Sequence, residues 1–445
     1  MVSLPRLVVA APSTGQGKTT IATGLMAALT RKGLKVQGFK AGPDFIDPAF
    51  HTAATGRPSR NLDTWMMGED LVLECFERAT AGADIAIIEG VMGLFDGYSG
   101  KEDAGSAAHL ARLLNAPVLL VVDASAMARS AAALVHGFAT FDPRVRVAGV
   151  LLNNLAGEGH YRYIADALEG SGAPPVGWMR RDEGLKVPER HLGLAPAHSG
   201  AWLDRLATAI SASVNLEAVM RLARTAGPTP APSRRAFDLP PAQARPTVAV
   251  ARDEAFWFYY QDGLDYLEAL GARLVPFSPI HDAAPPEPVD AVYIGGGYPE
   301  LYLEALAANQ PMLNWLGTAR ASVYAECGGL MYLSRAILDR EGRRWPMAGL
   351  LPTEADMGAG RLTLGYTTAT ARRDHLLARA GEQVRGHEFH ASRLSTPPAN
   401  PAWDCAGSYG ASHGDGFATA NRLASYVHLH LAANPLAAAS FMGLR

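Results

Sequence analysis

The segment at residues 11–20, APSTGQGKTT, limits what this chain can fold into more than any other part of the sequence. An apolar run of strand length at residues 7–11 leads into it, and a run of helical composition at residues 21–29 follows it. A strand, a glycine-rich turn and a helix in this order direct successive backbone N–H groups at an anion. This order favours a nucleotide-binding loop over the alternative, an ordinary strand-to-helix turn.

Each residue type in the loop has a role in binding a nucleotide. The glycines let the backbone curl, the lysine supplies a positive charge for the outer phosphates, and the first threonine can ligate Mg2+. The usual phosphate-loop pattern has glycine where this chain has Pro12, so the match is partial. The ATP-binding candidates in the loop are Gly15, Gly17, Lys18, Thr19 and Thr20.

Composition describes a globular chain of more than one domain. At 445 residues, with 48% hydrophobic and 19% charged residues, two or three domains are expected. The formal charge of -3 predicts neither a nucleic-acid nor a membrane partner, and we expect no membrane span and no signal peptide. Three widely spaced cysteines, Cys75, Cys327 and Cys405, argue against a disulfide scaffold or a zinc site and favour a reducing cytoplasm.

The first half of the chain alternates strand-like and helix-like runs, which predicts an α/β fold with a mostly parallel sheet. Ligands of such sheets collect at the carboxyl ends of the strands. The expected strands are residues 7–11, 35–39, 85–88, 117–123 and 147–154. The candidates that fall at such ends are Lys18, Asp44, Glu89, Asp123 and Asn153.

Acidic residues follow two of these strands. Glu89 closes an apolar strand, where phosphate-loop enzymes place a second Mg2+ contact, although a solvated strand end is the alternative. Asp44 and Asp47 lie in residues 40–48, expected to be a loop fixed by its prolines, where turn chemistry is the alternative to a metal or substrate role. Asp96 is a weaker candidate, because Phe-Asp-Gly is also a turn signal.

A proline-rich stretch at residues 226–246 predicts a linker between domains at 1–225 and 247–445. A second α/β series follows it. Its expected strands are residues 247–251, 273–277, 289–294 and 322–326, and its expected helices are residues 260–271 and 301–320, the second broken or kinked at Pro311.

Cys327 is the candidate nucleophile of the second half. It lies between a strand and a helix-like run and is followed by two glycines, which predicts a sharp turn that exposes the thiol beside an oxyanion-binding N–H. A helix N-terminus would also lower the thiol pKa. A buried structural cysteine is the alternative. His428 and His430, which alternate along an expected strand, are the candidate bases.

Other cysteines and histidines give weaker signals. Residues 386–390, GHEFH, read as a strand would point His387 to one face and Glu388 and His390 to the other, so only a pair could share a metal. Cys75 and Cys405 are expected to be packing residues.

Eight stretches together resemble the cobyrinic or hydrogenobyrinic acid a,c-diamide synthases of corrinoid biosynthesis, and they span nearly the whole chain. Pro12 is also similar to this family and to the dethiobiotin synthetase type of loop. The stretches are residues 11–20, 40–51 (KAGPDFIDPAFH), 89–97 (EGVMGLFDG), 251–260 (ARDEAFWFYY), 295–301 (GGGYPEL), 326–333 (ECGGLMYL), 386–392 (GHEFHAS) and 424–430 (ASYVHLH).

The resemblance implies a dethiobiotin synthetase-like phosphate-loop NTPase domain at 1–225 and a class I glutamine amidotransferase-like, flavodoxin-like domain at 247–445. It implies a cytoplasmic ligase that takes ATP with Mg2+, glutamine and a corrinoid tetrapyrrole, with a homodimer as one compatible state. Cys327 would attack glutamine and His428 would be its base. Many such glutaminases carry Glu two residues after that histidine, where this chain has His430, so a Cys–His dyad is expected.

The remaining roles also rest on the resemblance. Ammonia would displace phosphate from a carboxylate that ATP has activated. The implied site residues are Gly296, Gly297 and Gly328 for the oxyanion, Lys40 and Asn153 for ATP, Thr19, Asp44 and Glu89 for Mg2+, and Asp47 and Asp96 for the substrate or intermediate.

Two kinds of alternative stay open. One is the same chemistry on another tetrapyrrole, such as that of nickel-sirohydrochlorin a,c-diamide synthase or, more distantly, cobyric acid synthase. The other is a regulatory ATPase of the partitioning kind with a degenerate glutaminase-like module, against which an intact Cys327 and His428 argue.

Overall fold

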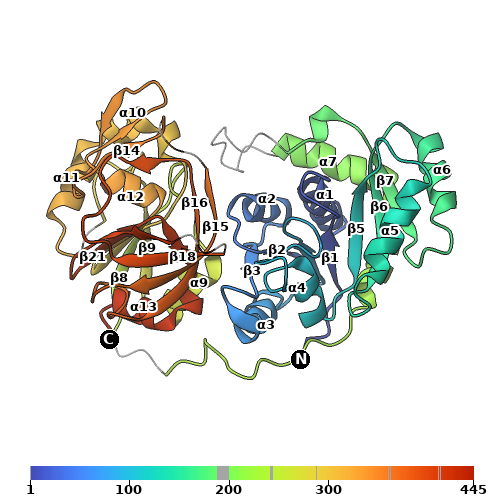
Figure 1. The fold of residues 1–445 in the computed structure, drawn as a ribbon, viewed down its shortest axis with the longest axis horizontal. Coiled ribbons are helices and arrows are strands. Elements are labelled where there is room, and N and C mark those ends of the chain that lie inside the picture. Colours follow the sequence, from blue (N-terminus) through green and yellow to red (C-terminus); the bar gives the residue numbers. More distant parts are fainter. Residues whose placement is uncertain are drawn as a thin grey trace. The chain divides into compact units, whose positions relative to one another are not determined.

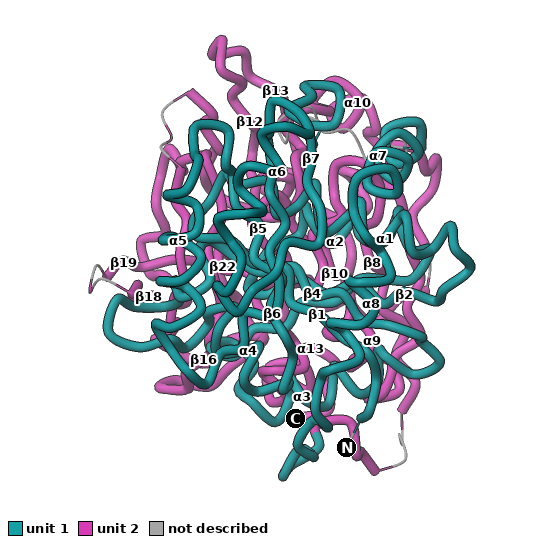
Figure 2. Tube along the Cα trace, turned by 90° about the vertical axis from the view of Figure 1, so that its right-hand side faces the viewer, with its two compact units in different colours: residues 1–235 teal, residues 236–445 magenta. Residues whose placement is uncertain are grey.

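The computed structural model describes residues 2–187, 200–240, 244–286, 288–358, 360, 362–408, 410 and 412–445. These residues form two compact units, Met1–Arg235 and Ala236–Arg445, which Figure 2 shows in different colours. In the described part of the chain, no helix combines the length and the apolar character that crossing a membrane requires. Each unit is built on a mainly parallel central sheet (Figure 1).

Unit 1 is a doubly wound sheet of parallel strands in the order β3-β2-β4-β1-β5-β6-β7. The connections run in both directions along the sheet, from β1 to β2 on one side and from β4 past β1 to β5 on the other. With the usual right-handed crossovers, this arrangement places helices on both faces of the sheet. The strands are β1 (Arg6–Ala10), β2 (Val36–Ala41), β3 (Arg60–Leu62), β4 (Ile85–Glu89), β5 (Val118–Asp123), β6 (Val147–Leu155) and β7 (Pro175–Arg180). The helices are α1 (Lys18–Arg31), α2 (Ile46–Thr55), α3 (Gly68–Ala79), α4 (Ala107–Leu113), α5 (Ser130–Thr140), α6 (Glu158–Ala167), α7 (Gly200–Ser213) and α8 (Leu216–Arg224).

The central strands of unit 1 are buried on both faces, as their continuous apolar sequences predict. Every residue of β1 and β4 is buried. The register pairs Val9 with Glu89 and Lys40 with Glu89, so the carboxyl ends of β1, β2 and β4 meet at one edge of the sheet. The predicted α/β fold with a mostly parallel sheet is confirmed.

Residues 226–240, the described part of the segment after α8, have no helix or strand, and hydrogen bonds hold part of this segment along unit 1. The guanidinium of Arg6 donates to the carbonyl of Gly227, and the N–H of Val2 donates to the hydroxyl of Thr229 at 3.0 Å. Further along, Ser233 donates to Asp70 in α3. Residues 227–233 therefore belong to the surface of unit 1, and residues 241–243 of the expected linker lie outside the described residues.

Unit 2 has a central sheet in the order β20-β21-β11-β10-β8-β9, parallel except for β20. Its elements are β8 (Thr247–Ala251), α9 (Gln261–Ala269), β9 (Arg273–Phe277), β10 (Ala291–Ile294), α10 (Leu303–Ala308), α11 (Gln310–Thr318), β11 (Ser322–Glu326), α12 (Gly328–Leu333), β20 (Phe417–Ala418), β21 (Arg422–Ser425) and α13 (Pro435–Phe441).

Two smaller sheets complete unit 2. One has the order β13-β12-β14-β17, and the other, the antiparallel sheet that we call sheet E, has the order β19-β18-β15-β16-β22. No strands were expected at residues 336–371 or 403–415, so most of both sheets was not predicted from the sequence. The strands are β12 (Ala336–Leu338), β13 (Arg344–Pro346), β14 (Ala355–Asp356), β15 (Thr363–Ala371), β16 (Gln383–His390), β17 (Arg393–Leu394), β18 (Trp403–Gly407), β19 (Ser412–Asp415) and β22 (Val427–Leu429).

One local expectation needs correction, and another is confirmed. Residues 40–48 are only partly a loop, because Lys40 lies in β2 and Pro48 lies in the first turn of α2. Proline is tolerated there, since the first N–H groups of a helix have no partner within it. The break expected in the helix at residues 301–320 is confirmed: α10 ends at Ala308, α11 begins at Gln310, and Pro311 is the second residue of α11.

Candidate functional site

The glycine-rich loop of unit 1 joins β1 to α1 as expected. Gly15 and Gly17 have φ of 86° and 92°, in the left-handed region that favours glycine. A Cβ on Gly17 would lie 2.2 Å from Nδ2 of Asn153, and this amide donates to the carbonyl of Gln16 at 2.9 Å. Asn153 therefore supports the loop, while its expected adenine contact stays a prediction.

A buried polar cluster lies beside this loop at the carboxyl ends of β2 and β4. The hydroxyl of Thr19 donates to Oε1 of Glu89 at 2.7 Å, and Nζ of Lys40 donates to the same oxygen at 2.8 Å. Lys40 also donates to Oδ2 of Asp47 at 2.5 Å. The second carboxylate oxygen of Glu89 lies 2.7 Å from Nε2 of His51. Carboxylate and hydroxyl oxygens gathered in this way suit a hard cation such as Mg2+.

The charges in this cluster stabilise one another. Burial opposes the charge of Lys40, but the carboxylates of Asp47 and Glu89 raise the pKa of its amine above the usual value. Burial likewise opposes the charge of Glu89, but Lys40 and a hydrogen bond from His51 hold the pKa of its carboxyl well below the usual value. Both groups are therefore charged at neutral pH.

Lys18 is the cationic residue of the loop itself. Its amine donates to the carbonyl of Ser13 at 2.9 Å. Burial and the neighbouring charge of Lys40 lower its pKa to about 8, although the carboxylates of Glu89, Asp47 and Asp96 act in the opposite direction. A phosphate bound at the loop would raise this pKa again, so nucleotide binding should be coupled to protonation of Lys18.

We therefore expect ATP affinity to fall as the pH rises above about 8. There the free amine must take up a proton when ATP binds, and the loss should approach about tenfold per pH unit. Calorimetric titration of nucleotide from about pH 7 to about pH 9 measures it. The Lys18→Arg variant is the control, because a guanidinium stays charged throughout this range. An equal pH dependence in both proteins would contradict the prediction.

The remaining candidates of unit 1 lie around this cluster. Oδ1 of Asp44 accepts the N–H groups of Ile46 and Asp47 at the start of α2, and its other oxygen lies 3.8 Å from Nζ of Lys40. Asp96 is exposed and accepts the N–H of Gly93 at 2.9 Å. Asp47, expected beside the substrate, contacts Lys40 and lies 3.3 Å from the Thr19 hydroxyl, within the same cluster as Glu89.

Sequence reasoning assigned no role to His51, although it lies within the quoted stretch at residues 40–51. Its side chain is fully buried and joins Glu89 to the hydroxyl of Ser59, 3.3 Å from Nδ1. It lies one helical turn after Asp47 in α2, which places both residues on the face turned toward β2 and β4. The i, i+4 spacing of two polar residues in an apolar helix was the available signal.

Cys327 has the expected geometry of a nucleophile at a strand-to-helix turn. It follows β11, directly precedes α12 and has φ 48° and ψ −101°, a conformation rare for a residue with a side chain. Its N–H donates to the carbonyl of Ser425 at 2.8 Å, and its thiol lies 3.4 Å from the carbonyl of Phe389 in β16.

The expectation of a lowered thiol pKa is wrong for this state of the protein. Burial, with a contribution from the charge of Glu300, raises the pKa of Cys327 well above its usual value. Burial also raises the pKa of Glu300 itself, to about 7. The short helix α12 does not offset the loss of solvation, so a base must remove the thiol proton for Cys327 to react.

The glycines proposed for the oxyanion site pack against one another and against His428. A Cβ on Gly328 would lie 3.1 Å from the backbone nitrogen of Gly297. A Cβ on Gly296 would lie 2.5 Å from Cε1 of His428, and one on Gly297 would lie 2.0 Å from the carbonyl of Ala255. Only glycine allows this close approach, which brings the turn after β10, the start of α12 and the imidazole together.

Glu326 is a residue of this site that sequence reasoning missed. Its carboxylate is buried, and Oε2 lies 3.4 Å from Nδ1 of His428. It is held by the hydroxyl of Tyr293 at 3.1 Å, by the hydroxyl of Tyr324 and by the N–H of Leu429 at 3.0 Å. From the sequence, Glu326 was only the last residue of an expected strand, directly before Cys327. Its contact with His428 becomes visible only in the folded structure.

The other histidines of the region serve different contacts. His387 lies opposite His428 in the register of β16 and β22, their rings stack with centroids 5.0 Å apart, and its Nδ1 lies 3.0 Å from the hydroxyl of Tyr260. His430 does not extend β22. It lies at the start of a 3-10 turn, where its Nδ1 accepts the N–H of Ala433 at 3.3 Å.

The fold and the two sites define a class: a nucleotide-binding domain joined to a glutamine amidotransferase domain. Residues 7–194 match the family model of the CobQ/CobB/MinD/ParA nucleotide binding domain, and residues 247–436 match that of the CobB/CobQ-like glutamine amidotransferase domain. The chain belongs to the cobyrinate and hydrogenobyrinate a,c-diamide synthase family, because relatives with these names match it at 40–46% identity over nearly its full length.

Three of these relatives represent the group. Cobyrinate a,c-diamide synthase of Dehalococcoides mccartyi (strain CBDB1) is 44% identical over 99% of this chain and 98% of its own. The enzyme of that name from Syntrophotalea carbinolica is 46% identical over 99% and 98%. Hydrogenobyrinate a,c-diamide synthase of Streptomyces coelicolor is 42% identical over 99% and 97%. The family and both domain types inferred from the sequence are thus confirmed.

Proposed function

We propose that this protein amidates the a and c side-chain carboxylates of cobyrinate or hydrogenobyrinate, using ATP and the amide nitrogen of glutamine. The observation that carries the proposal is that one chain holds both a cysteine at a strained strand-to-helix turn and a phosphate loop beside the Lys40–Glu89 cluster. The names of the full-length relatives support the choice of substrate.

In unit 2, Cys327 attacks the glutamine amide and forms a thioester, and the departing nitrogen leaves as ammonia after protonation by His428. His428 first takes the thiol proton, which the raised pKa of Cys327 makes necessary. Backbone N–H groups of Gly297 and Gly328 stabilise the oxyanion. Water then releases glutamate. This chemistry needs a free thiol, so the enzyme would work in a reducing compartment such as the cytoplasm.

In unit 1, a macrocycle carboxylate attacks the γ-phosphorus of ATP and becomes an acyl phosphate, which ammonia converts into the amide with release of phosphate. Lys18 and Lys40 offset negative charge on the transferred group. Thr19, Asp44 and Glu89, with Asp47 beside them, would hold Mg2+, which when bound neutralises charge on the phosphates. Asp96 is left to orient the carboxylate or its acyl phosphate.

Mass spectrometry of candidate tetrapyrroles incubated with ATP, Mg2+ and glutamine tests this function. Each amidation exchanges a hydroxyl for an amino group, so two such mass changes on cobyrinate or hydrogenobyrinate are expected. A product formed from nickel-sirohydrochlorin and from neither corrinoid would overturn the substrate assignment. ATP hydrolysis without amidation of any of these rings would overturn the ligase assignment.

We further propose that Glu326 is the positioning residue of His428. A carboxylate held by two tyrosines and a backbone N–H can fix the tautomer and the orientation of the imidazole that it contacts. In many glutaminases a glutamate two residues after the histidine has this role. Here Glu326, the last residue of the strand before the nucleophile, would have it.

The Glu326→Gln variant should hydrolyse glutamine roughly a hundredfold more slowly, with the loss in kcat and not in KM. Amidation with free ammonium should stay near the wild-type rate, since unit 1 is unaltered. Steady-state assays with glutamine and with ammonium measure both rates, and Glu341→Gln, an exposed carboxylate of unit 2, is the control. Unchanged glutamine hydrolysis in a folded Glu326→Gln protein would contradict the role.

A further inference from the structure

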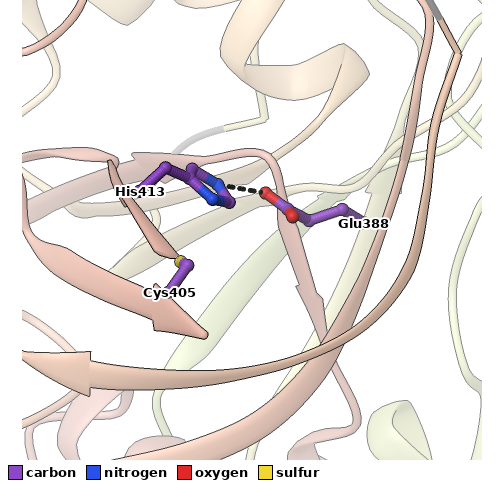
Figure 3. A group of neighbouring side chains, drawn as sticks. All are labelled: Glu388, Cys405 and His413. Atoms are coloured by element: carbon purple, nitrogen blue, oxygen red, sulfur yellow. Dashed lines mark hydrogen bonds and ion pairs between the residues drawn. The ribbon is translucent and has the colours of Figure 1, made fainter. Parts of the chain in front are cut away.

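Three potential metal ligands gather on one face of sheet E (Figure 3). Glu388 comes from β16, Cys405 from β18 and His413 from β19, and one ligand atom from each lies within 4.8 Å of the other two. Glu388 and Cys405 are buried, whereas the His413 side chain is 49% exposed. The group thus has a fixed inner part and one ligand open to solvent.

The register of sheet E explains why these side chains meet. Cys405 lies opposite both His413 in β19 and Ala369 in β15, and Glu388 lies opposite Gly365 in β15. Residues 365 and 369 are separated by an even number of positions in β15, so their side chains and those of their partners in the neighbouring strands project from the same face. All three potential ligands therefore lie on that face. The residue in β15 beside Glu388 is a glycine and the one beside Cys405 is an alanine, so the Glu388 side chain has room to reach across the strand.

The same register separates this group from the glutaminase site. Glu388 lies opposite Val427, whereas the next position pairs His387 with the proposed base His428. Successive residues of a strand point to opposite faces, so the three side chains lie on the other face of sheet E from His428. A ligand bound there would not touch the proposed catalytic groups.

We propose that Glu388, Cys405 and His413 bind one Zn2+ ion, with water in the remaining coordination position. Thiolate, imidazole and carboxylate are the protein ligands that zinc takes, and a set of three with one open position is a known arrangement. Ligand atoms around a tetrahedral zinc are about 3.5 Å apart, so the group must close slightly. The half-exposed His413 can move to do so.

Binding requires a definite change of protons. The thiol of Cys405, whose pKa burial raises, loses its proton to water as the sulfur–zinc bond forms. Oε1 of Glu388 lies 3.0 Å from Nε2 of His413, a hydrogen bond that raises the pKa of the imidazole. Zinc displaces the proton from Nε2 of His413: an imidazolium loses it to water, whereas a neutral imidazole keeps it on Nδ1.

A simple ion pair between Glu388 and His413 would also explain why these two of the three side chains lie together. It does not explain why a buried thiol lies on the same face within reach of both. The two accounts differ in what Cys405 does: it is a packing residue in the ion-pair account and a metal ligand in ours. The experiment therefore follows the thiol.

The test uses the full-length protein, freed of metal with a chelator and then titrated with Zn2+ against a chromophoric competitor. We expect one high-affinity ion per chain. The affinity for Zn2+ should be at least about a hundredfold lower in Cys405→Ser and in His413→Ala, a larger loss than removing a residue that only hydrogen-bonds to a ligand usually causes. Cys75→Ser, another buried cysteine, and His281→Ala, an exposed histidine paired with Glu254, are the matched controls.

Cobalt then identifies the sulfur. Co2+ in the site should give thiolate-to-metal charge-transfer absorption that persists in Cys327→Ser and disappears in Cys405→Ser. If Cys405→Ser does not fold, His413→Ala decides, because replacing a half-exposed side chain removes less packing than replacing a buried one. Absence of binding, or equal affinity in His413→Ala and the wild type, would overturn the site. Neither result depends on the proposed synthase activity.

Discussion

Replacing Cys327 with serine should abolish glutamine-dependent amidation while leaving amidation with free ammonium. The serine hydroxyl is a far weaker nucleophile than a thiolate, and we expect glutamine hydrolysis to fall by at least about a thousandfold. Unit 1 contains the whole phosphate-loop cluster within its own sheet, so its chemistry does not need the thiol. Assays of glutamate release and of amide product, each with glutamine or with ammonium chloride, separate the two activities.

The matched control is Cys75→Ser, which changes a buried cysteine of α3 outside both proposed sites. Its activity with both nitrogen donors should follow the amount of folded protein. If Cys327→Ser loses amidation with ammonium as well, while its thermal unfolding is unchanged, the two half-reactions do not occupy separate sites. The two-site scheme would then fail, whatever the substrate is.

Glu89→Gln should have the opposite effect. The substitution keeps the shape of the side chain but removes the charge that Lys40, Thr19 and His51 contact. It leaves the Lys40 amine facing an amide and takes away a proposed Mg2+ ligand. We expect amidation to fall roughly a thousandfold with either nitrogen source, the size of effect seen when a group that stabilises developing charge is removed. Glutamine hydrolysis should persist.

Stability must be measured beside activity, because breaking a buried ion pair can cost about 3–5 kcal/mol of folding free energy. Thermal unfolding with and without ATP shows whether the Glu89→Gln protein is folded. Glu77→Gln is the control, since this carboxylate of unit 1 pairs with Arg235 away from the loop. Near-normal amidation by a folded Glu89→Gln protein would remove Glu89 from the chemistry.

The sequence was most informative where local chemistry and position along the chain were sufficient. Strand β1, the turn with Gly15 and Gly17 and the helix α1 follow one another directly, so their order alone indicated a phosphate loop. The turn at Cys327 was inferred in the same way from β11 and the two glycines after it. In both cases the residues that form the feature are neighbours in sequence.

The sequence was least informative where partners come from separate strands. Cys405 was expected to be a packing residue and a zinc site was not expected, because the three cysteines are widely spaced and odd in number. The register of sheet E brings Cys405 opposite His413 and places Glu388 on the same face. Most of that sheet was not predicted, so the cluster could not be either.

The prediction of a lowered pKa for Cys327 failed for a related reason. The position before a helix predicts a lowered value, but the burial that raises it comes from side chains and backbone of several distant elements. Desolvation depends on everything packed around a group, and a local motif contains little of that information.

By itself, then, the sequence determined the two-part architecture, the phosphate loop, the candidate nucleophile and the family, because each depends on residues that are contiguous or on a series of such stretches. Only the tertiary structure decided that Glu89 is shared by Lys40, Thr19 and His51, and that Glu326 contacts His428. These contacts join the ends of separate strands, and the order of strands in a sheet is set by long-range pairing that no local pattern specifies.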